Sequence, residues 1–421
     1  MQSKKNRNYL FIFNLLLIIF LFSSNIAWLN PFPDWEVYRS FESIPFLWQY
    51  DIDNPIELIS AAYFPDFFYE NSTRLERPGY PILVKLLTSL IYLFLENFIN
   101  IEYIYIAAGA YIIIKIIFSL IAIICLNSLL QDHFNNDYSK LGLILYFFQW
   151  SYITYMCDIH TTDTHLNTPV IIIYLISKVL IYKNFFLNIL FGFLIGYTML
   201  IKSNYAVYFS IILLLLINKY YLIVLVNFFS HIIPFVLYFL FLTYKNIPIY
   251  FHNEGHGGGD MVVFLFDLVK DFEFKIIINQ IFFSIFSYII VILKYYHFFL
   301  ILFLFGIFSY YKKKYNKNFL IASLFILFFS WLQFYLALKF ENDVYMAGDV
   351  AIIIYFFILY FLKEVDILNF KYLQKYNLYI FILLINIYLI IQLPYIEPYS
   401  QKYKNWQEDF NSKEIKYKTV N

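Results

Sequence analysis

The sequence predicts an all-α membrane protein that crosses the bilayer many times. Of its 421 residues, 62% are hydrophobic and only 14% are charged, whereas a soluble chain is about 45–50% apolar and about 25% charged. Apolar runs near the length of about 20 residues that spans a bilayer recur between short polar turns. So little charge excludes an ordinary soluble enzyme. The net charge of +1 gives no basic field for nucleic acid.

The first span follows three basic residues, Lys4, Lys5 and Arg7. A basic segment before a span stays in the cytoplasm. The apolar run over residues 9–29 is longer than the apolar region of a signal peptide, so we interpret it as an uncleaved membrane helix. Residues 30–79 are polar and hold more acids than bases. The positive-inside rule therefore places them outside, as a long first outer loop with short interfacial helices.

The rest of the chain alternates apolar segments with short turns. Residues 80–97 begin Tyr-Pro and carry Lys85, and they form either a membrane helix or an amphipathic helix on the outer surface. Further spans are predicted at 103–130, 141–157, 167–182, 185–201, 205–218, 222–243, 295–311, 319–338, 350–362 and 376–394. Together with the first span this gives about 10–12 transmembrane helices.

Sidedness follows from the positions of the lysines. The strongest cytoplasmic mark is the group Lys312, Lys313, Lys314 and Lys317. Residues 244–275 then become a second outer loop. A further span at 276–293 would put the basic N-terminus and the lysine group on opposite sides of the membrane. We therefore predict an outer-surface or re-entrant helix there. Residues 1–394 thus form a single transmembrane domain, and 395–421 form a polar C-terminal tail that this topology places outside.

Polar residues gather in three clusters that this topology places on the outer face. They lie at 33–39, 158–165 and 252–260. The cations Arg74, Arg77 and Lys202 also lie at outer ends of helices. Carboxylates beside cations suit group transfer from a lipid-linked anion. A carboxylate can take the proton of an acceptor hydroxyl, and a phosphate leaving group needs Arg or Lys. Each residue also has a structural explanation, such as helix capping for an Asp or snorkelling for a Lys.

Four motifs stand in a characteristic order. They are Asp34-Trp35-Glu36-Val37-Tyr38, Arg77-Pro78-Gly79-Tyr80-Pro81, Thr162-Asp163-Thr164-His165-Leu166 and Gly196-Tyr197-Thr198-Met199-Leu200-Ile201-Lys202. In order and sidedness they resemble the GT-C superfamily of membrane glycosyltransferases. The likeness is to the branch with protein O-mannosyltransferases and lipid A aminoarabinose transferases, which use polyprenyl-phosphate sugars. The resemblance covers about the first half of the chain. At 345–350, where many relatives have an Arg-Tyr pair, this chain has no Arg.

The resemblance implies roles for the motif residues. Asp34 would be the acceptor-activating base of an inverting displacement, with Glu36 as the alternate. Asp163 would orient the acceptor or a metal. The donor phosphate would be bound by Lys202 and Arg77. From its position, Arg74 is a further candidate for the phosphate, and Tyr80, His252 and His256 are candidates for the substrate loops.

The chain has no segment that firmly requires a cofactor. The residue types at 160–165 offer one candidate, a divalent metal held by His160, Asp163 and His165. Their spacing matches no HExxH motif. Alternatively, these histidines are ordinary loop residues that face the solvent.

The leading hypothesis is a glycosyltransferase of the cell envelope, in the bacterial inner membrane with its site facing the periplasm. It would move a hexosyl or pentosyl group from a polyprenyl-phosphate donor to a saccharide, lipid or protein acceptor. The alternative is a transporter or flippase, or a polymerase, of lipid-linked saccharides. The chain has no phosphate-binding loop for ATP and no internal repeat, and its loop at 244–275 has no Arg.

Overall fold

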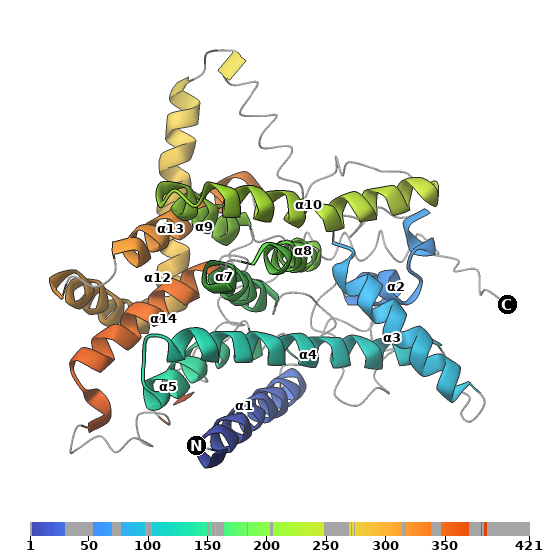
Figure 1. Cartoon of the computed structure of the whole chain (residues 1–421), viewed down its shortest axis with the longest axis horizontal. Coiled ribbons are helices and arrows are strands. Elements are labelled where there is room, and N and C mark those ends of the chain that lie inside the picture. The colour runs from blue at the N-terminus through green and yellow to red at the C-terminus, as the bar shows by residue number, and fades with distance from the viewer. Residues whose placement is uncertain are drawn as a thin grey trace.

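The computed structural model describes most of the helical part of this chain. The described residues are 2–29, 54–69, 77–96, 101, 103–149, 152–153, 156, 164–182, 184–202, 205–247, 269–270, 272, 274–313, 317–337, 347–369, 380 and 383–384. Every regular element within these ranges is a helix, as predicted (Figure 1).

Four helical segments are long and apolar enough to cross a membrane. They are α4 (Tyr103–Gln131), α10 (Tyr221–Tyr244), the first part of α12 (Phe274–Lys312) and most of α13 (Lys317–Ala337). The other long helices are α1 (Gln2–Leu29), α7 (Thr164–Tyr182), α8 (Phe185–Ile201), α9 (Tyr205–Ile217) and α14 (Ala347–Glu364). The chain is therefore a multi-pass membrane protein. The predicted total of 10–12 spans stays a prediction.

Side-chain caps set several helix boundaries. Asn184 accepts hydrogen bonds from the backbone N–H groups of Phe186 and Leu187, which starts α8. Asn135 does the same for Tyr138 at the start of α5 (Asn136–Phe147). The predicted span at 141–157 was misplaced, because α5 begins earlier and ends at Phe147. There the Nε2 of Gln149 donates to the carbonyl of Tyr146 at 2.6 Å and satisfies a helix-end acceptor.

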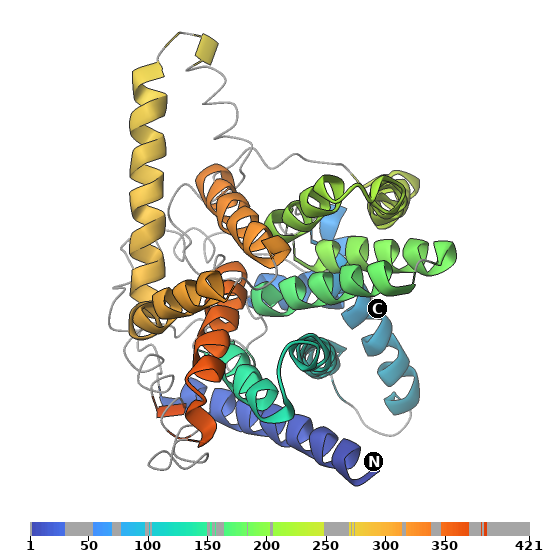
Figure 2. The ribbon, with the colours of Figure 1, turned by 60° about the vertical axis from the view of Figure 1, so that its left-hand side comes forward.

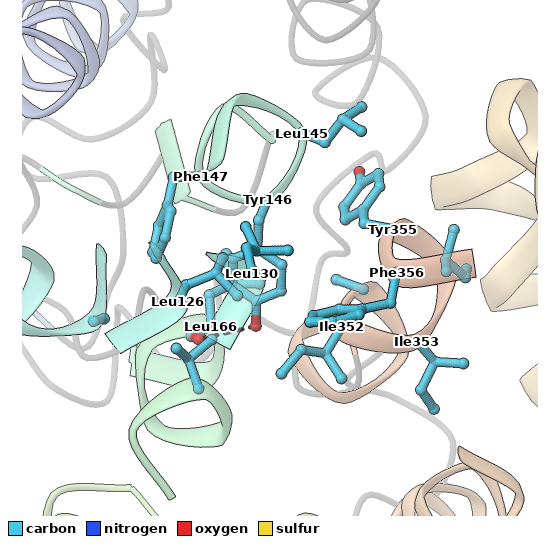
Figure 3. Packing of buried hydrophobic residues seen from close by; sticks show 14 of the residues in the cluster. Leu126, Leu130, Leu145, Tyr146, Phe147, Leu166, Ile352, Ile353, Tyr355 and Phe356 are labelled. Carbon is cyan, nitrogen blue, oxygen red and sulfur yellow. Dashed lines mark hydrogen bonds between the residues drawn. The ribbon is translucent and has the colours of Figure 1, made fainter. Parts of the chain in front are cut away.

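The core of the bundle is formed around α14, in which every residue from Gly348 to Tyr360 is buried. Helix α14 packs between α5, α7 and α12. Figure 3 shows Tyr146 of α5 near Ile352 and Phe356 of α14, with its hydroxyl directed at Leu166 of α7. Beyond Glu364, a short turn η4 (Ile367–Asn369) follows.

Helices α8 and α10 are in close contact. Gly192 and Gly196 of α8 face Ser230 and the carbonyl of His231 on α10, where an added Cβ would have no room. Small residues spaced four apart let two membrane helices approach closely. The two helices therefore pack backbone to backbone.

Two helices and a short turn precede α4 in the chain, and the two helices pack against it. They are α2 (Asn54–Ala62), the 3-10 turn η2 (Asp66–Tyr69) and α3 (Gly79–Leu95). Lys85 of α3 donates to the carbonyl of Ala62 at 3.0 Å, and its ammonium lies 4.7 Å from the ring centre of Tyr103. These contacts explain a lysine in the middle of an apolar segment, because a helix C-terminus and an aromatic face both attract a cation.

Three helix ends meet at one end of the bundle. The hydroxyl of Tyr138 donates to the carbonyl of Leu362 at 3.1 Å. Lys313 and Glu364 form an ion pair of 2.8 Å between the ends of α12 and α14. The same end of the bundle therefore holds the α4–α5 turn and the ends of α12 and α14, and its side of the membrane stays a prediction.

Residues 276–293 and 295–311, which we treated as two segments, belong to one helix, α12. No Gly or Pro interrupts the sequence between them. Its first part projects away from the bundle in Figures 1 and 2, and the two parts of α12 run in different directions in Figure 2. This first part satisfies the length of a span, and its predicted outer-surface or re-entrant placement stays a prediction.

Candidate functional site

The predicted site residues that the structure describes lie at two helix junctions. One joins the beginning of α3 to the end of α8, and the other joins the beginnings of α7 and α14. We call them the α3–α8 junction and the α7–α14 junction. Both lie at helix ends that the predicted topology places outside.

The α3–α8 junction brings two of the four motifs into contact. Tyr197 donates its hydroxyl to the carbonyl of Gly79, 118 residues earlier in the chain, at 3.0 Å. A Cβ on Gly79 would lie 2.5 Å from Cγ1 of Ile201 and 2.7 Å from its backbone nitrogen. Only a glycine allows this approach of the two backbones. The contact places Arg77 and Lys202 at the same junction.

Lys202 ends α8 and is buried, with 2% of its surface exposed. Its backbone is extended, and its N–H donates to the carbonyl of Thr198 at 3.1 Å. A snorkelling lysine keeps its ammonium in water, whereas this side chain lies inside the protein. Arg77 is partly buried at the entry to α3, and its Nε is buried. Both residues make further interactions within the protein.

Tyr80, predicted in a substrate loop, lies in the first turn of α3 and is fully buried. Its ring stacks on Tyr111 of α4, with centroids 5.4 Å apart and planes at 11°, and it meets the edge of Phe118. Such aromatic packing stabilises the contact of α3 with α4. This packing helps to fix the start of α3, and a contact of Tyr80 with substrate stays a prediction.

The α7–α14 junction brings the third motif to the beginning of a late helix. Gly348 packs against the carbonyl of His165, without room for a Cβ. The hydroxyl of Tyr146 lies 3.0 Å from the carbonyl of Leu166 and 3.5 Å from that of Gly348. The side chain of His165 is buried. This region of α14 is where the sequence departs from the family pattern.

Sequence reasoning missed Asp349, which follows Gly348 and is buried at 3% exposure. It is the one buried carboxylate among the residues that the structure describes. It lies close enough to interact electrostatically with the hydroxyls of Tyr146, Tyr288 and Tyr296. The sequence feature that could have indicated Asp349 is an acidic residue at the start of an otherwise apolar segment.

Several predicted residues lie outside the described residues, so their positions stay predictions: Asp34, Glu36, Arg74, His160, Asp163, His252 and His256. Helix α7 begins at Thr164, directly after Asp163. Within the described ranges, no three His, Cys, Asp or Glu side chains come together as metal ligands. The proposed partners of His165 in a metal site lie outside those ranges.

Comparisons with models of protein families, with characterised proteins and with solved structures find no match for this chain. The α3–α8 junction offers two cations, one of them deeply buried, and such a pair suits a phosphate group. The α7–α14 junction offers a buried acid and tyrosine hydroxyls.

Proposed function

We propose that this protein is a membrane glycosyltransferase that uses a polyprenyl-phosphate sugar as donor. The acceptor would be a saccharide, lipid or protein at the outer membrane face. The observation that carries the proposal is the α3–α8 junction, where the Gly79–Ile201 contact brings Arg77 and buried Lys202 together. These residues come from two motifs that resemble the GT-C superfamily.

The proposed reaction is a single displacement at the anomeric carbon of the donor sugar. The acceptor hydroxyl oxygen forms the new bond to that carbon, and the bond between the carbon and the phosphate oxygen breaks. The carboxylate of Asp34 takes the acceptor proton. The leaving polyprenyl phosphate gains a negative charge, which Lys202 and Arg77 stabilise. The displacement inverts the configuration of the sugar.

The test is sugar transfer by the purified protein in proteoliposomes. Labelled polyprenyl-phosphate hexoses and pentoses are supplied with a cell-envelope extract as acceptor source. The label on the acceptor and the released polyprenyl phosphate are both measured. Wild type should transfer one of these sugars, and Asp34→Asn should slow transfer by about 10²–10⁴-fold. Full transfer by Asp34→Asn would remove Asp34 as the base.

A matched pair of lysine variants tests the phosphate contact. Lys202→Met should lower kcat/KM for the donor by about 10-fold or more, because a charge-assisted hydrogen bond is lost. Lys312→Met changes an exposed lysine at the opposite end of the bundle and should leave transfer unchanged. Equal activity of the two variants would argue against a phosphate site at the α3–α8 junction.

One observation favours the second candidate, a flippase of lipid-linked saccharides. Lys115 is fully buried near the middle of α4, and charges inside spans often mark transport pathways. Movement of a labelled lipid-linked sugar between leaflets, without any transfer of the sugar, would favour this candidate.

A further inference from the structure

Helix α10 ends in a motif that turns the chain back on itself. Asn246 has a positive φ of 53°, which Asn tolerates better than most residues. The N–H of Ile247 donates to the carbonyl of Leu242 at 3.0 Å, and the N–H of Asn246 donates to that of Thr243 at 3.1 Å. This is a Schellman motif, which satisfies helix-end carbonyls and pairs an apolar residue beyond the helix with one in its last turn. Here the apolar pair is Ile247 and Leu242, and both are buried.

Aromatic residues from the segment 64–69 pack on this helix end, which lies next to α2 and α3 in Figure 1. Phe64 and Phe68 form one buried cluster with the apolar pair of the Schellman motif. The ring of Phe64 stacks on that of Phe241 in α10, with centroids 5.7 Å apart and planes at 10°. The edge of Phe68 meets Phe64 at 5.7 Å. Such aromatic pairs stabilise the contact beyond the apolar area that they bury.

A hydrogen bond adds to this packing. The hydroxyl of Tyr69, the last residue of η2, donates to the carbonyl of Lys245 at 2.7 Å, across 176 residues of sequence. Lys245 caps α10. The last carbonyls of a helix lack donors within the helix, and Tyr69 supplies one. We call the aromatic packing and this hydrogen bond together the η2–α10 contact.

The η2–α10 contact also reaches α3. Ile82, in the first turn of α3, packs against the same apolar cluster. The same turn meets α8 through the contact of Gly79 with Ile201, and it meets α4 through the ring of Tyr80. Helix α10 in turn packs closely on α8. Contacts therefore run in a closed circuit from α3 to α8, to α10, to η2 and back to α3.

This circuit surrounds the place where the two motif cations enter the structure. Arg77 lies two residues before α3, and Lys202 follows the last residue of α8. Without the η2–α10 contact, the first turn of α3 would be held by α8 and α4 alone. A small misplacement of a group that binds substrate can cost much of the rate. The η2–α10 contact therefore matters for any ligand bound at the α3–α8 junction.

We propose that Tyr69 and Phe64 are positioning residues for the donor phosphate. They hold the start of α3 at the end of α10 and thereby keep Arg77 beside the end of α8. Both act through Arg77 and not through a contact of their own with the donor. This assignment rests on the proposed glycosyltransferase function.

The first test measures donor kcat/KM in proteoliposomes and the binding of undecaprenyl phosphate to the full-length protein. Tyr69→Phe should lower both kcat/KM and affinity by about 5-fold, because one hydrogen bond is lost. Tyr244→Phe is the matched control. It removes the same group from the residue before Lys245, whose side chain is 81% exposed, and it should change neither quantity. Phe64→Ala should lower kcat/KM by about 10–100-fold, and Phe64→Leu should recover most of the loss.

The second test separates positioning from general destabilisation. Arg77→Gln removes the group through which Tyr69 is proposed to act, while Lys202 still binds the phosphate. In this background, Tyr69→Phe should change donor kcat/KM and the affinity for undecaprenyl phosphate by less than about 2-fold. A purely structural role would give the same loss in both backgrounds. Resistance to unfolding in SDS is measured for every variant, and Tyr69→Phe decides where Phe64→Ala does not fold.

Two results would overturn the assignment while the wild type is active. They are unchanged donor kcat/KM in Tyr69→Phe, and an equal loss on Tyr69→Phe with and without Arg77. Wild type that neither binds undecaprenyl phosphate nor transfers sugar would overturn the proposed function itself, and this assignment with it.

Discussion

The contact of Gly79 with Ile201 offers a sharp test of how the α3–α8 junction is built. In Gly79→Ala, the new Cβ would lie 2.5 Å from Cγ1, 2.7 Å from the nitrogen and 2.9 Å from the Cα of Ile201. Rotation of the isoleucine side chain can relieve only the first contact. The other two are with backbone atoms, so α3 and α8 must move apart by several tenths of an ångström.

The cost is that of inserting a group into a packed interior, about 1–3 kcal/mol of unfolding free energy. The intrinsic preference of a helix for Ala over Gly offsets at most about 1 kcal/mol of it. The displacement also separates Arg77 from Lys202. Because a misplacement of about 1 Å can cost about 100-fold in rate, we expect donor kcat/KM to fall by about 10–100-fold.

The assay combines unfolding in mixed SDS micelles with sugar transfer in proteoliposomes. Gly109→Ala is the matched control, because nothing lies within 4 Å of a Cβ at that position of α4. It should be as active as wild type and at least as stable. Gly79→Ala with wild-type stability and wild-type transfer would refute the reasoning about this junction.

Three other contacts can be tested in the same way. Gly348→Ala should destabilise the protein by about 1–3 kcal/mol, measured by unfolding in SDS, because a Cβ would collide with the carbonyl of His165; unchanged stability would contradict the α7–α14 packing. Lys85→Met should cost about 1 kcal/mol in the same assay, through loss of the hydrogen bond to Ala62, and an equally stable variant would show that the bond contributes nothing. Burial, with Lys363 also contributing and Asp132 opposing, lowers the pKa of His133 in the α4–α5 turn below its ordinary 6.5. The stability that depends on neutral His133 is therefore present above pH 6.5 and is lost as the pH falls through the lowered pKa. Wild type should lose more stability than His133→Gln between pH 7.5 and 5, and parallel losses would argue against this effect.

The sequence was sufficient to predict where most helices lie, because apolar length and lysine-marked turns are local signals. Helices α4, α8 and α10 fall within a few residues of the predicted spans. The misplaced end of α5 depended on Gln149, whose amide reaches back to Tyr146. That contact depends on one side chain and leaves no periodic pattern in the sequence.

The site was predicted in part. The motifs indicated Arg77 and Lys202, but not that Gly79 is the residue that lets their helices touch. Asp349 and Lys115 stand alone in apolar segments, and their significance lies in burial among neighbours distant in the chain. Burial of that kind depends on tertiary packing, which the sequence pattern of one segment does not report.

We propose, above all, a site for a lipid-linked phosphate at the helix ends that the predicted topology places outside. Its most direct test is the unfolding free energy of wild type and Lys202→Met, measured with undecaprenyl phosphate or with undecaprenol, which lacks the phosphate. At a concentration 100 times Kd, a ligand specific for the folded state stabilises it by about 2.7 kcal/mol. We predict stabilisation of wild type by the phosphate lipid, little by the alcohol, and a much weaker effect of the phosphate lipid on Lys202→Met. Equal stabilisation by the two lipids, or of the two proteins by the phosphate lipid, would contradict the claim.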